Sequence, residues 1–210
     1  MAILNEISEA VQQGKVKAVK ELVQKAVDEK AAAKDVLDNG LLVGMSIVGE
    51  KFKNNEVFVP EVLLAARALN AGTAILKPLL IQAGVKSHGK AAIGTVKGDL
   101  HDIGKNLVKL MFEGKGIEVF DLGADVAPEK FIETVKANDC QIIACSALLT
   151  TTMAAMKDVV DAAVKAGIRD KVKIMVGGAP ITQAYADQIG ADGFTADAAS
   201  AADLAVKLIG

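Results

Sequence analysis

The stretch Ala91-Ala92-Ile93-Gly94-Thr95-Val96, followed after Lys97 by Gly98-Asp99-Leu100-His101-Asp102-Ile103-Gly104, decides the fold of the second half of the chain. Its first part is short and mostly apolar, as in a buried strand, and its second part is a loop bounded by glycines. Further strands are expected at 117–122, 141–146, 172–176 and near 193–194, with helices at 105–113, 128–137, 152–166, 181–189 and from 199. Strict alternation of strand and helix predicts a parallel sheet with helices on both faces.

Five such units over residues 89–210 fit a flavodoxin-like, doubly wound, five-stranded Rossmann-like α/β domain. Residues 1–88 show only a helical period. Four amphipathic helices are expected there: one through Ile3–Val11, one through Val19–Val27, one from Asp35 with Leu41, Met45, Val48 and Phe52 on one face, and one from Pro60 to Gly84. The sequence therefore predicts an N-terminal four-helix bundle, 1–88, ahead of the sheet domain, 89–210.

Composition excludes several classes of function. The chain has 210 residues and a formal net charge of -2, so it lacks the basic footprint of a nucleic-acid-binding protein. The apolar stretch from Phe58 to Val85 is interrupted by charges, which argues against a membrane span. Cys140 and Cys145 do not form a Cys-x-x-Cys pair, and only two histidines are present, so neither a disulfide framework nor a zinc site is expected. We expect a soluble cytoplasmic protein.

Three distinctive segments follow strands of the predicted sheet. Gly98–Gly104 follows the first strand, Ser146-Ala147-Leu148 ends the third and Gly177-Gly178 ends the fourth. Open parallel sheets bind ligands beyond the carboxyl ends of their strands, where the strand order reverses. In flavodoxin-like order, the first and third strands flank that point. The sequence therefore predicts a ligand site at this edge.

The residues at this edge narrow the choice of ligand. The Gly-x-Gly-x-x-Gly and Walker patterns are absent, and Ser146 stands where a phosphoacceptor domain needs an aspartate. What remains is an imidazole, His101, two residues after the carboxylate of Asp99. A carboxylate that binds one ring nitrogen of a histidine turns the other nitrogen toward a metal, and one histidine can supply an axial ligand to a metal held by a macrocycle. A solvated histidine is the alternative.

The ordered set Asp99-x-His101-x-x-Gly104, Ser146-x-Leu148 and Gly177-Gly178 resembles the cobalamin-binding fingerprint. Its spacing also matches, with 41 residues between Gly104 and Ser146 and 28 between Leu148 and Gly177. In the first half, Gly44–Phe52 and Val57–Glu61 resemble the helical cap of methionine synthase and of the small corrinoid proteins of methyltransferase systems. The resemblance covers nearly the whole chain.

The resemblance implies a cobalamin or related corrinoid bound base-off, with His101 as the lower axial ligand of cobalt. It implies that Asp99 hydrogen-bonds His101 and that Thr152 continues this chain, although serine is more usual in the family at that position. Ser146 would bind the lower base, while Leu148, Thr150, Gly177 and Gly178 would line the slot for the nucleotide tail. The loop contributes Gly98, Asp102 and Gly104 to the same cofactor site; for Asp102 the alternative is a charge at the start of the next helix.

The resemblance also implies that the bundle covers the upper, methyl-bearing face of the cofactor. Phe52 and Val59 correspond to the covering residues, with Val59 in place of a leucine, and Met45 is a further candidate. For Phe52 and Met45 the alternative is a place in the core of the bundle.

The function implied is that of a corrinoid methyl carrier, a subunit rather than a complete enzyme. It would accept a methyl group on cobalt through a substrate-specific methyltransferase and deliver it through an acceptor methyltransferase, with a reductive activator as a third partner. Methanol, methylamines, aryl methyl ethers and methyl thiols are all open as donors, and tetrahydrofolate, a methanopterin or coenzyme M as acceptors. A mutase subunit and a cobalamin sensor are the alternatives, but the cap argues against the first and the lack of an output module against the second.

Overall fold

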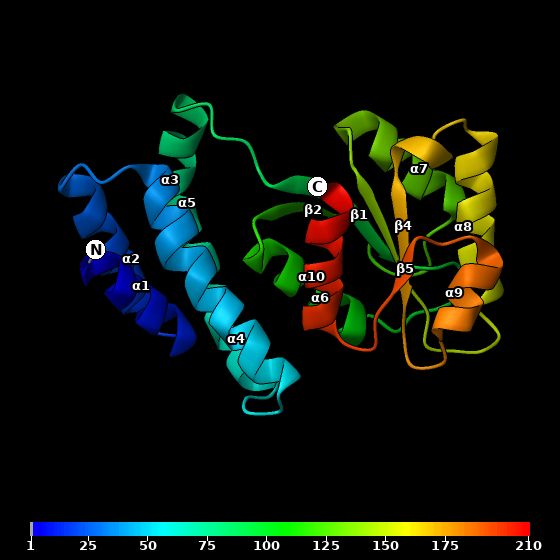
Figure 1. The fold of residues 1–210 in the computed structure, drawn as a ribbon, viewed down its shortest axis with the longest axis horizontal. Helices are drawn as coiled ribbons and strands as arrows, with labels where there is room; N and C mark the ends of the chain where they lie inside the picture. Colours follow the sequence, from blue (N-terminus) through cyan, green and yellow to red (C-terminus); the bar gives the residue numbers. More distant parts are fainter. Residues whose placement is uncertain (1) are drawn as a thin grey trace. The chain divides into compact units, whose positions relative to one another are not determined.

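The computed structural model describes residues 2–210, which form two compact units. The first unit runs to Ser87 and also includes Gly114–Gly116, and the second comprises His88–Glu113 and Ile117–Gly210. The first is helical throughout, and the second alternates strands with helices (Figure 1). A helical N-terminal part followed by a five-stranded parallel sheet is the predicted fold class.

The helical unit contains α1 (Ala2–Gln12), α2 (Val16–Asp28), α3 (Ala33–Val36), the π-helical segment η1 (Leu37–Leu42), α4 (Val43–Lys53) and α5 (Val59–Gln82). The predicted third helix is thus interrupted by a π-helical turn, which the spacing of its apolar residues does not show. Leu41, Met45 and Val48 are nonetheless buried on one face, as predicted. Glycines let this stretch lie close to α1, because a Cβ atom on Gly44 would lie 2.7 Å from the carbonyl oxygen of Ser8.

Helix α5 begins as the sequence predicts, with Pro60 in its first turn. The side chain of Glu61 accepts a hydrogen bond from the backbone N–H of Phe58 at 3.0 Å and so caps the helix start. By length and composition alone α5 is apolar enough to cross a membrane, but it packs against α2 as a core helix of its unit. Its buried side includes Val62, Leu69 and Leu76.

The second unit is a five-stranded parallel sheet with the strand order β2-β1-β3-β4-β5, as predicted. Its strands are β1 (Gly89–Thr95), β2 (Ile117–Asp121), β3 (Ile142–Ser146), β4 (Lys173–Gly177) and β5 (Gly193–Phe194). Thr95 pairs with Ser146, and Ser146 pairs with Gly177, so the last residues of β1, β3 and β4 stand side by side. The loops that follow these strands therefore leave the sheet at one edge.

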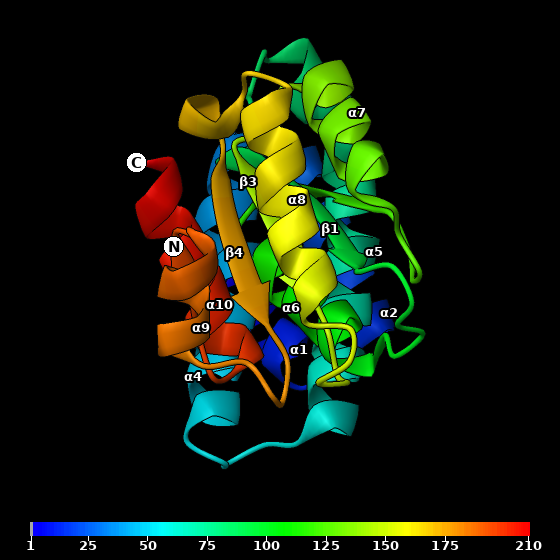
Figure 2. The same cartoon turned by 90° about the vertical axis from the view of Figure 1, so that its right-hand side faces the viewer.

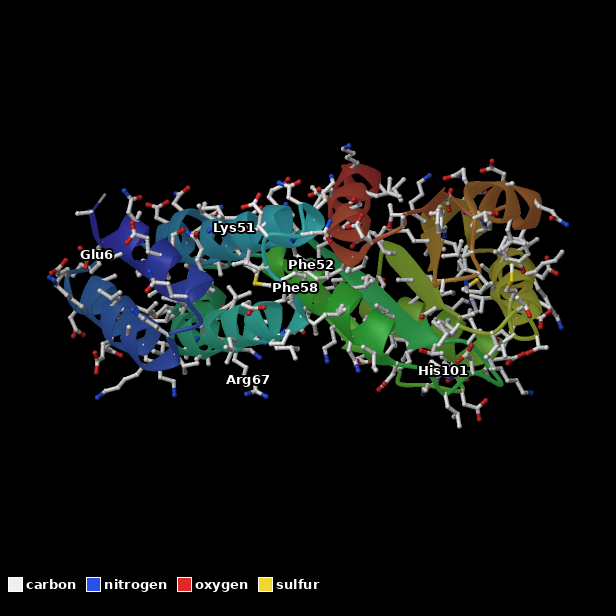
Figure 3. All side chains as sticks on the ribbon, turned by 90° about the horizontal axis from the view of Figure 1, so that it is seen from below. Glu6, Lys51, Phe52, Phe58, Arg67 and His101 are labelled. Atoms are coloured by element: carbon white, nitrogen blue, oxygen red, sulfur yellow. The ribbon has the colours of Figure 1, made fainter. Side chains whose placement is uncertain are left out.

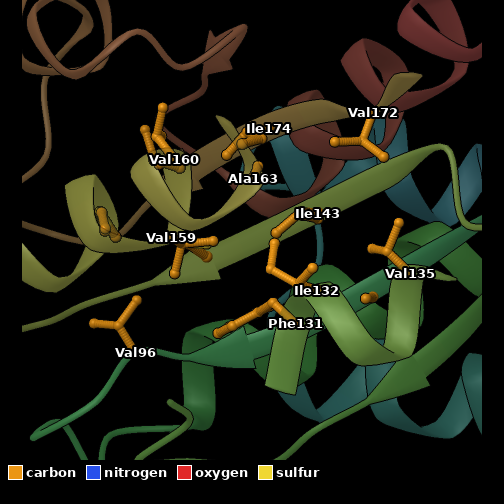
Figure 4. Close-up of a cluster of buried hydrophobic side chains, with 14 of the residues drawn as sticks. Val96, Phe131, Ile132, Val135, Ile143, Val159, Val160, Ala163, Val172 and Ile174 are labelled. Carbon is orange, nitrogen blue, oxygen red and sulfur yellow. The ribbon is translucent and has the colours of Figure 1, made fainter. Parts of the chain in front are cut away.

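Helices cover both faces of this sheet (Figures 1 and 2). On one face lie α7 (Pro128–Asn138), α8 (Ala154–Lys165) and α9 (Gln183–Ile189), and on the other α6 (Ile103–Gly114) and α10 (Ala198–Ile209). A short 3₁₀ turn, η2 (Arg169–Lys171), precedes β4. Figure 4 shows the core of the first face, where Phe131, Ile143, Val159 and Ile174 are fully buried. This packed layer holds the strand ends in place.

The two cysteines are free thiols inside the sheet unit. Cys145 is buried in the core on the side of the sheet that carries Phe131 and Val159. Burial raises the pKa of Cys145 to about 12 and that of Cys140 to about 11, so both thiols stay protonated at neutral pH.

Candidate functional site

The carboxylate of Asp99 joins the two loops that leave β1 and β3. Its Oδ1 accepts hydrogen bonds from the backbone N–H of His101 at 3.0 Å and from ring atom Nδ1 of His101 at 2.8 Å. Its Oδ2 accepts from the backbone N–H groups of Leu148 and Leu149, at 2.8 and 3.2 Å, and from Oγ1 of Thr152 at 2.7 Å. The side chain is fully buried. One carboxylate thus collects five donors, three of them from the far loop.

These hydrogen bonds decide the charge of Asp99. Burial by itself would raise the pKa of Asp99, but the hydrogen bond from Thr152, the backbone N–H groups of His101 and Leu148 and the His101 ring together hold that pKa well below its usual value. Asp99 is therefore a carboxylate at neutral pH.

The charge of Asp99 fixes the orientation of His101. A carboxylate only accepts hydrogen bonds, so in the neutral imidazole the proton lies on Nδ1 and the lone pair on Nε2. The His101 side chain is 51% exposed even though its partner carboxylate is fully buried. Figure 3 shows His101 at the loop end of the sheet unit. The site therefore presents an oriented ring nitrogen, Nε2, at the surface of this unit.

The backbone around His101 is held from β1 as well. The hydroxyl of Thr95, the last residue of β1, donates a hydrogen bond to the carbonyl oxygen of His101 at 2.9 Å. Thr95 is fully buried. Gly98 has a φ of +84°, a left-handed conformation that glycine adopts without strain. The loop is therefore set by contacts within the sheet unit.

Large apolar side chains are exposed in the segments that Asp99 and His101 belong to or bind. Leu100 and Ile103 are each 76% exposed, Leu148 is 43% exposed and Leu149 is 42% exposed. Four such side chains, in the loop after β1, at the start of α6 and in the loop after β3, mark a candidate binding site for an apolar group. Together with the oriented nitrogen of His101, they suit a broad, flat ligand that carries a metal, which is the chemistry of a corrinoid.

The glycines of the site divide into two kinds. A Cβ atom on Gly178, which has a φ of +131°, would lie 1.9 Å from the carbonyl oxygen of Ala147, so only glycine fits this close approach of the loops after β3 and β4. A Cβ atom on Gly104 or on Gly177 would meet nothing within 4 Å. The space beside these two residues is open, as a cofactor slot requires.

The other residues predicted for the sheet unit lie at the same edge. Ser146 is half-buried at the end of β3, and Thr150 is exposed in the turn that follows. Asp102 is exposed directly before α6, where its carboxylate accepts a hydrogen bond from the side-chain amide of Asn106 at 3.1 Å. This contact matches the alternative considered for Asp102, a residue at the start of a helix.

The three predicted cap residues belong to the helical unit. Met45 is buried at 1% exposure, while Phe52 and Val59 are half-buried. Phe52 lies near the end of α4 and Val59 at the start of α5, so both flank the turn between these helices, and Figure 3 labels Phe52 there. Their contact with a cofactor stays a prediction of the resemblance.

Sequence reasoning missed several residues of the site. Leu100, Ile103 and Leu149 form much of the exposed apolar surface, and the signal for them was available, because apolar residues in a ligand-binding loop need a partner to cover them. Thr95 and Asp125 hold the backbone of the loop. Asp125 follows β2, whose end carries no fingerprint residue, so nothing in the sequence pointed to it.

Comparison with known proteins agrees with this geometry. The family model described as B12 binding domain matches residues 89–205, and a second B12 binding domain model matches residues 3–77. A corrinoid protein of Desulfitobacterium hafniense is 42% identical over 213 residues, which cover 100% of this chain and 99% of that protein. The dimethylamine corrinoid protein of Methanosarcina barkeri is 42% identical over 208 residues, covering 99% of this chain and 97% of that protein.

Solved structures show the same fold. The methanol:cobalamin methyltransferase complex MtaBC from Methanosarcina barkeri contains a chain that matches with a TM-score of 0.88 and 31% identity, covering 99% of this chain and 80% of that one. A cobalamin-binding protein from Desulfitobacterium hafniense matches with a TM-score of 0.81 and 33% identity, covering 99% of this chain and 98% of that one. The protein therefore belongs to the B12-binding corrinoid proteins, the family of the corrinoid proteins of methyltransferase systems.

Proposed function

We propose that this protein is a methyl carrier that binds its corrinoid base-off, with Nε2 of His101 as the lower axial ligand of cobalt. The observation that carries the proposal is the half-exposed imidazole whose Nδ1 is held 2.8 Å from the buried carboxylate of Asp99. A metal-bound histidine needs such a partner to fix its tautomer and ring orientation. The exposed apolar side chains around it supply the surface for the macrocycle.

When bound, the corrinoid supplies a cobalt ion that takes up a methyl group and gives it up again. The residues of this chain orient the imidazole of His101 and hold the proton on its Nδ1. Asp99 keeps the Nδ1 proton of His101 in place, and Thr152 donates its hydroxyl hydrogen to the other carboxylate oxygen. An Nε2 that holds no metal could accept a proton, and the carboxylate of Asp99 would stabilise the imidazolium that results. Ligation and protonation of His101 are thereby coupled.

The remaining residues of the edge are assigned to the rest of the cofactor. Gly98, Asp102 and Gly104 belong to the loop beneath the macrocycle. Ser146 binds the lower base, and Leu148, Thr150, Gly177 and Gly178 line the slot for the nucleotide tail. The open space beside Gly104 and Gly177 supports this assignment.

The helical unit, residues 1–88, is proposed to act as a cap for the domain of residues 89–210. Phe52, Val59 and Met45 then cover the methyl-bearing face of the cofactor. A cap of this kind keeps water from the reacting centre and has to move aside when a partner enzyme needs the methyl group.

The partners of the carrier are a substrate-specific methyltransferase, an acceptor methyltransferase and a reductive activator, all in the cytoplasm. The names of the relatives place methylamines and methanol first among the donors to be tested. The relatives named above are corrinoid proteins of methyltransferase systems, which favours the carrier over the mutase.

Reconstitution with methylcobalamin tests the ligand. The visible spectrum of the wild-type complex should show a histidine on cobalt, and His101→Ala should instead give the spectrum of a cofactor with no lower nitrogen ligand. His88→Ala, a change at the other histidine, is the matched control and should keep the wild-type spectrum. An unchanged spectrum for His101→Ala would refute the assignment.

A second experiment tests the carrier role. The reduced, loaded protein is mixed with a methyltransferase specific for methylamines or for methanol and with the isotopically labelled donor. Label should stay with the loaded protein only when both enzyme and donor are present. A preference for adenosylcobalamin together with isomerase activity would instead favour the mutase.

A further inference from the structure

The loop after β2 is hydrogen-bonded to the loop Gly98–His101, although it carries no residue of the cobalamin-binding fingerprint. Oδ1 of Asp125 accepts a hydrogen bond from the backbone N–H of Gly98 at 2.7 Å. The backbone N–H of Asp125 in turn donates to the carbonyl oxygen of Asp99 at 3.0 Å. Asp125 thus binds both the N–H of Gly98 and the carbonyl oxygen of Asp99, the residue whose carboxylate orients His101.

The position of Asp125 is itself fixed by the sheet. The next residue, Val126, is buried, its N–H donates to the carbonyl oxygen of Thr95 at 3.0 Å, and it forms a parallel bridge with Val96. Asp125 has a φ of +56°, a left-handed conformation that aspartate tolerates better than most residues. The anchored neighbour and the local conformation together aim the carboxylate at Gly98.

We propose that Asp125 is a positioning residue for cofactor ligation: it holds the Gly98-Asp99 backbone so that Asp99 and His101 are already oriented before the corrinoid binds. The proposal rests on the proposed role of His101 as the cobalt ligand. Without the side chain of Asp125, the backbone of Asp99 gains freedom, and part of the binding free energy of the ligand must be spent on ordering it. Asp125 is exposed, so the expected loss is that of one ordinary hydrogen bond.

The test uses Asp125→Gly, because glycine adopts a φ of +56° without strain and the change removes the side-chain hydrogen bond while adding backbone freedom. Asp139→Gly is the matched control, since Asp139 also has a left-handed φ, of +53°, but caps the end of α7. The Kd for methylcobalamin is measured by spectral titration of the apo protein. Each change is made in the wild-type chain and in the His101→Ala chain, and the thermal unfolding midpoint of every variant is recorded.

Asp125→Gly is expected to raise the Kd about three- to tenfold in the wild-type chain, which is the effect of one lost hydrogen bond. In the His101→Ala chain it should change the Kd by less than about twofold, because a residue that acts through His101 has nothing left to orient. Asp125→Asn keeps an acceptor oxygen for Gly98 and should restore most of the affinity. Asp139→Gly should leave the Kd unchanged in both chains.

An equal loss of affinity in the two chains, or no loss in the wild-type chain, overturns the role of Asp125. If His101→Ala alone binds methylcobalamin as the wild type does, the ligand assignment itself fails, and the two failures are thus told apart. Should His101→Ala bind too weakly to titrate, the Co(II) form of Asp125→Gly is examined by electron paramagnetic resonance. A reduced fraction of histidine-ligated cobalt supports the positioning role, and an unchanged fraction contradicts it.

Discussion

Asp99 lies between His101 and Thr152, with Nδ1 of His101 2.8 Å from one carboxylate oxygen and Oγ1 of Thr152 2.7 Å from the other. The carboxylate is inaccessible to solvent, while the imidazole is half exposed. The same group that orients the imidazole therefore also ties the loop after β1 to the loop after β3. Ligand geometry and the stability of this edge of the sheet depend on one side chain.

Asp99→Asn should destabilise the apo protein. The amide nitrogen of asparagine would face N–H or O–H donors whichever way the side chain is turned, because both carboxylate oxygens of Asp99 only accept. Loss of buried acceptors of this kind costs about 3 kcal/mol in the free energy of unfolding. Urea denaturation followed by circular dichroism measures it, and a loss below about 1 kcal/mol would show that the carboxylate is not a structural centre.

Acid should unfold the wild-type protein more steeply than Asp99→Asn. The folded-state pKa of Asp99 lies below the unfolded value of about 3.9, so its contribution to stability is fully present above that pH and is lost as the pH falls toward the folded-state pKa. The free energy of unfolding of the two proteins should therefore converge below about pH 4. Curves that remain parallel down to pH about 3 would contradict the shift. Burial alone would raise the pKa of Asp121, but hydrogen bonds from Lys105, from the backbone N–H of Gly123 and from Lys109, with the charge of Lys105, together lower it, so Asp121 contributes to acid sensitivity in both proteins.

Thr152→Val and Thr152→Ser separate the hydroxyl from the methyl group of this side chain. Valine keeps the shape but removes the donor to Asp99, so we expect a loss of about 1–2 kcal/mol in stability and weaker ligation by His101. Serine keeps the donor and should retain wild-type ligation. Urea denaturation and the visible spectrum of the methylcobalamin complex measure the two effects. A valine variant that behaves like the wild type, together with an impaired serine variant, would show that packing, not the hydroxyl, is what matters.

The glycines of the site should respond in opposite ways to alanine. Gly178→Ala forces the loops after β3 and β4 apart and should cost more than about 2 kcal/mol in stability, because the new Cβ atom would overlap the carbonyl of Ala147. Gly104→Ala and Gly177→Ala place a methyl group in open space and should leave the stability of the apo protein nearly unchanged.

The same two variants should nevertheless bind methylcobalamin more weakly, because the cofactor is proposed to fill that space. Thermal unfolding of the apo proteins and spectral titration separate the two effects. Wild-type affinity in both Gly104→Ala and Gly177→Ala would place the cofactor elsewhere.

The sequence predicted the sheet and the site edge because both depend on local patterns. Alternation of strands and helices determined the order of the sheet, and the positions of Ser146 and Gly177 at strand ends brought them together through the register of β3 and β4. Asp99 and His101 are two residues apart, so their hydrogen bond is nearly a local property of the loop.

What the sequence did not predict depends on tertiary packing. The π-helical turn at Leu37–Leu42 keeps the same apolar residues on the buried side, so a hydrophobic pattern cannot reveal it. Leu63 lies within the predicted fourth helix but is 40% exposed, because the buried side of α5 is formed by residues such as Val62, Leu69 and Leu76. Asp125 reaches Gly98 across 27 residues of chain, through a contact that exists only after β1 and β2 have paired.

Electron paramagnetic resonance of the Co(II) form, prepared with ¹⁵N-labelled histidine, tests the central claim most directly. The unpaired electron of Co(II) in a corrinoid couples to the nucleus of its lower axial nitrogen. If Nε2 of His101 is that ligand, each cobalt line, a triplet with ordinary nitrogen, becomes a doublet in the labelled protein, remains so in His88→Ala and loses the coupling in His101→Ala. A triplet that persists in the labelled protein would mean that the nitrogen comes from the cofactor's own base and that His101 is not the cobalt ligand.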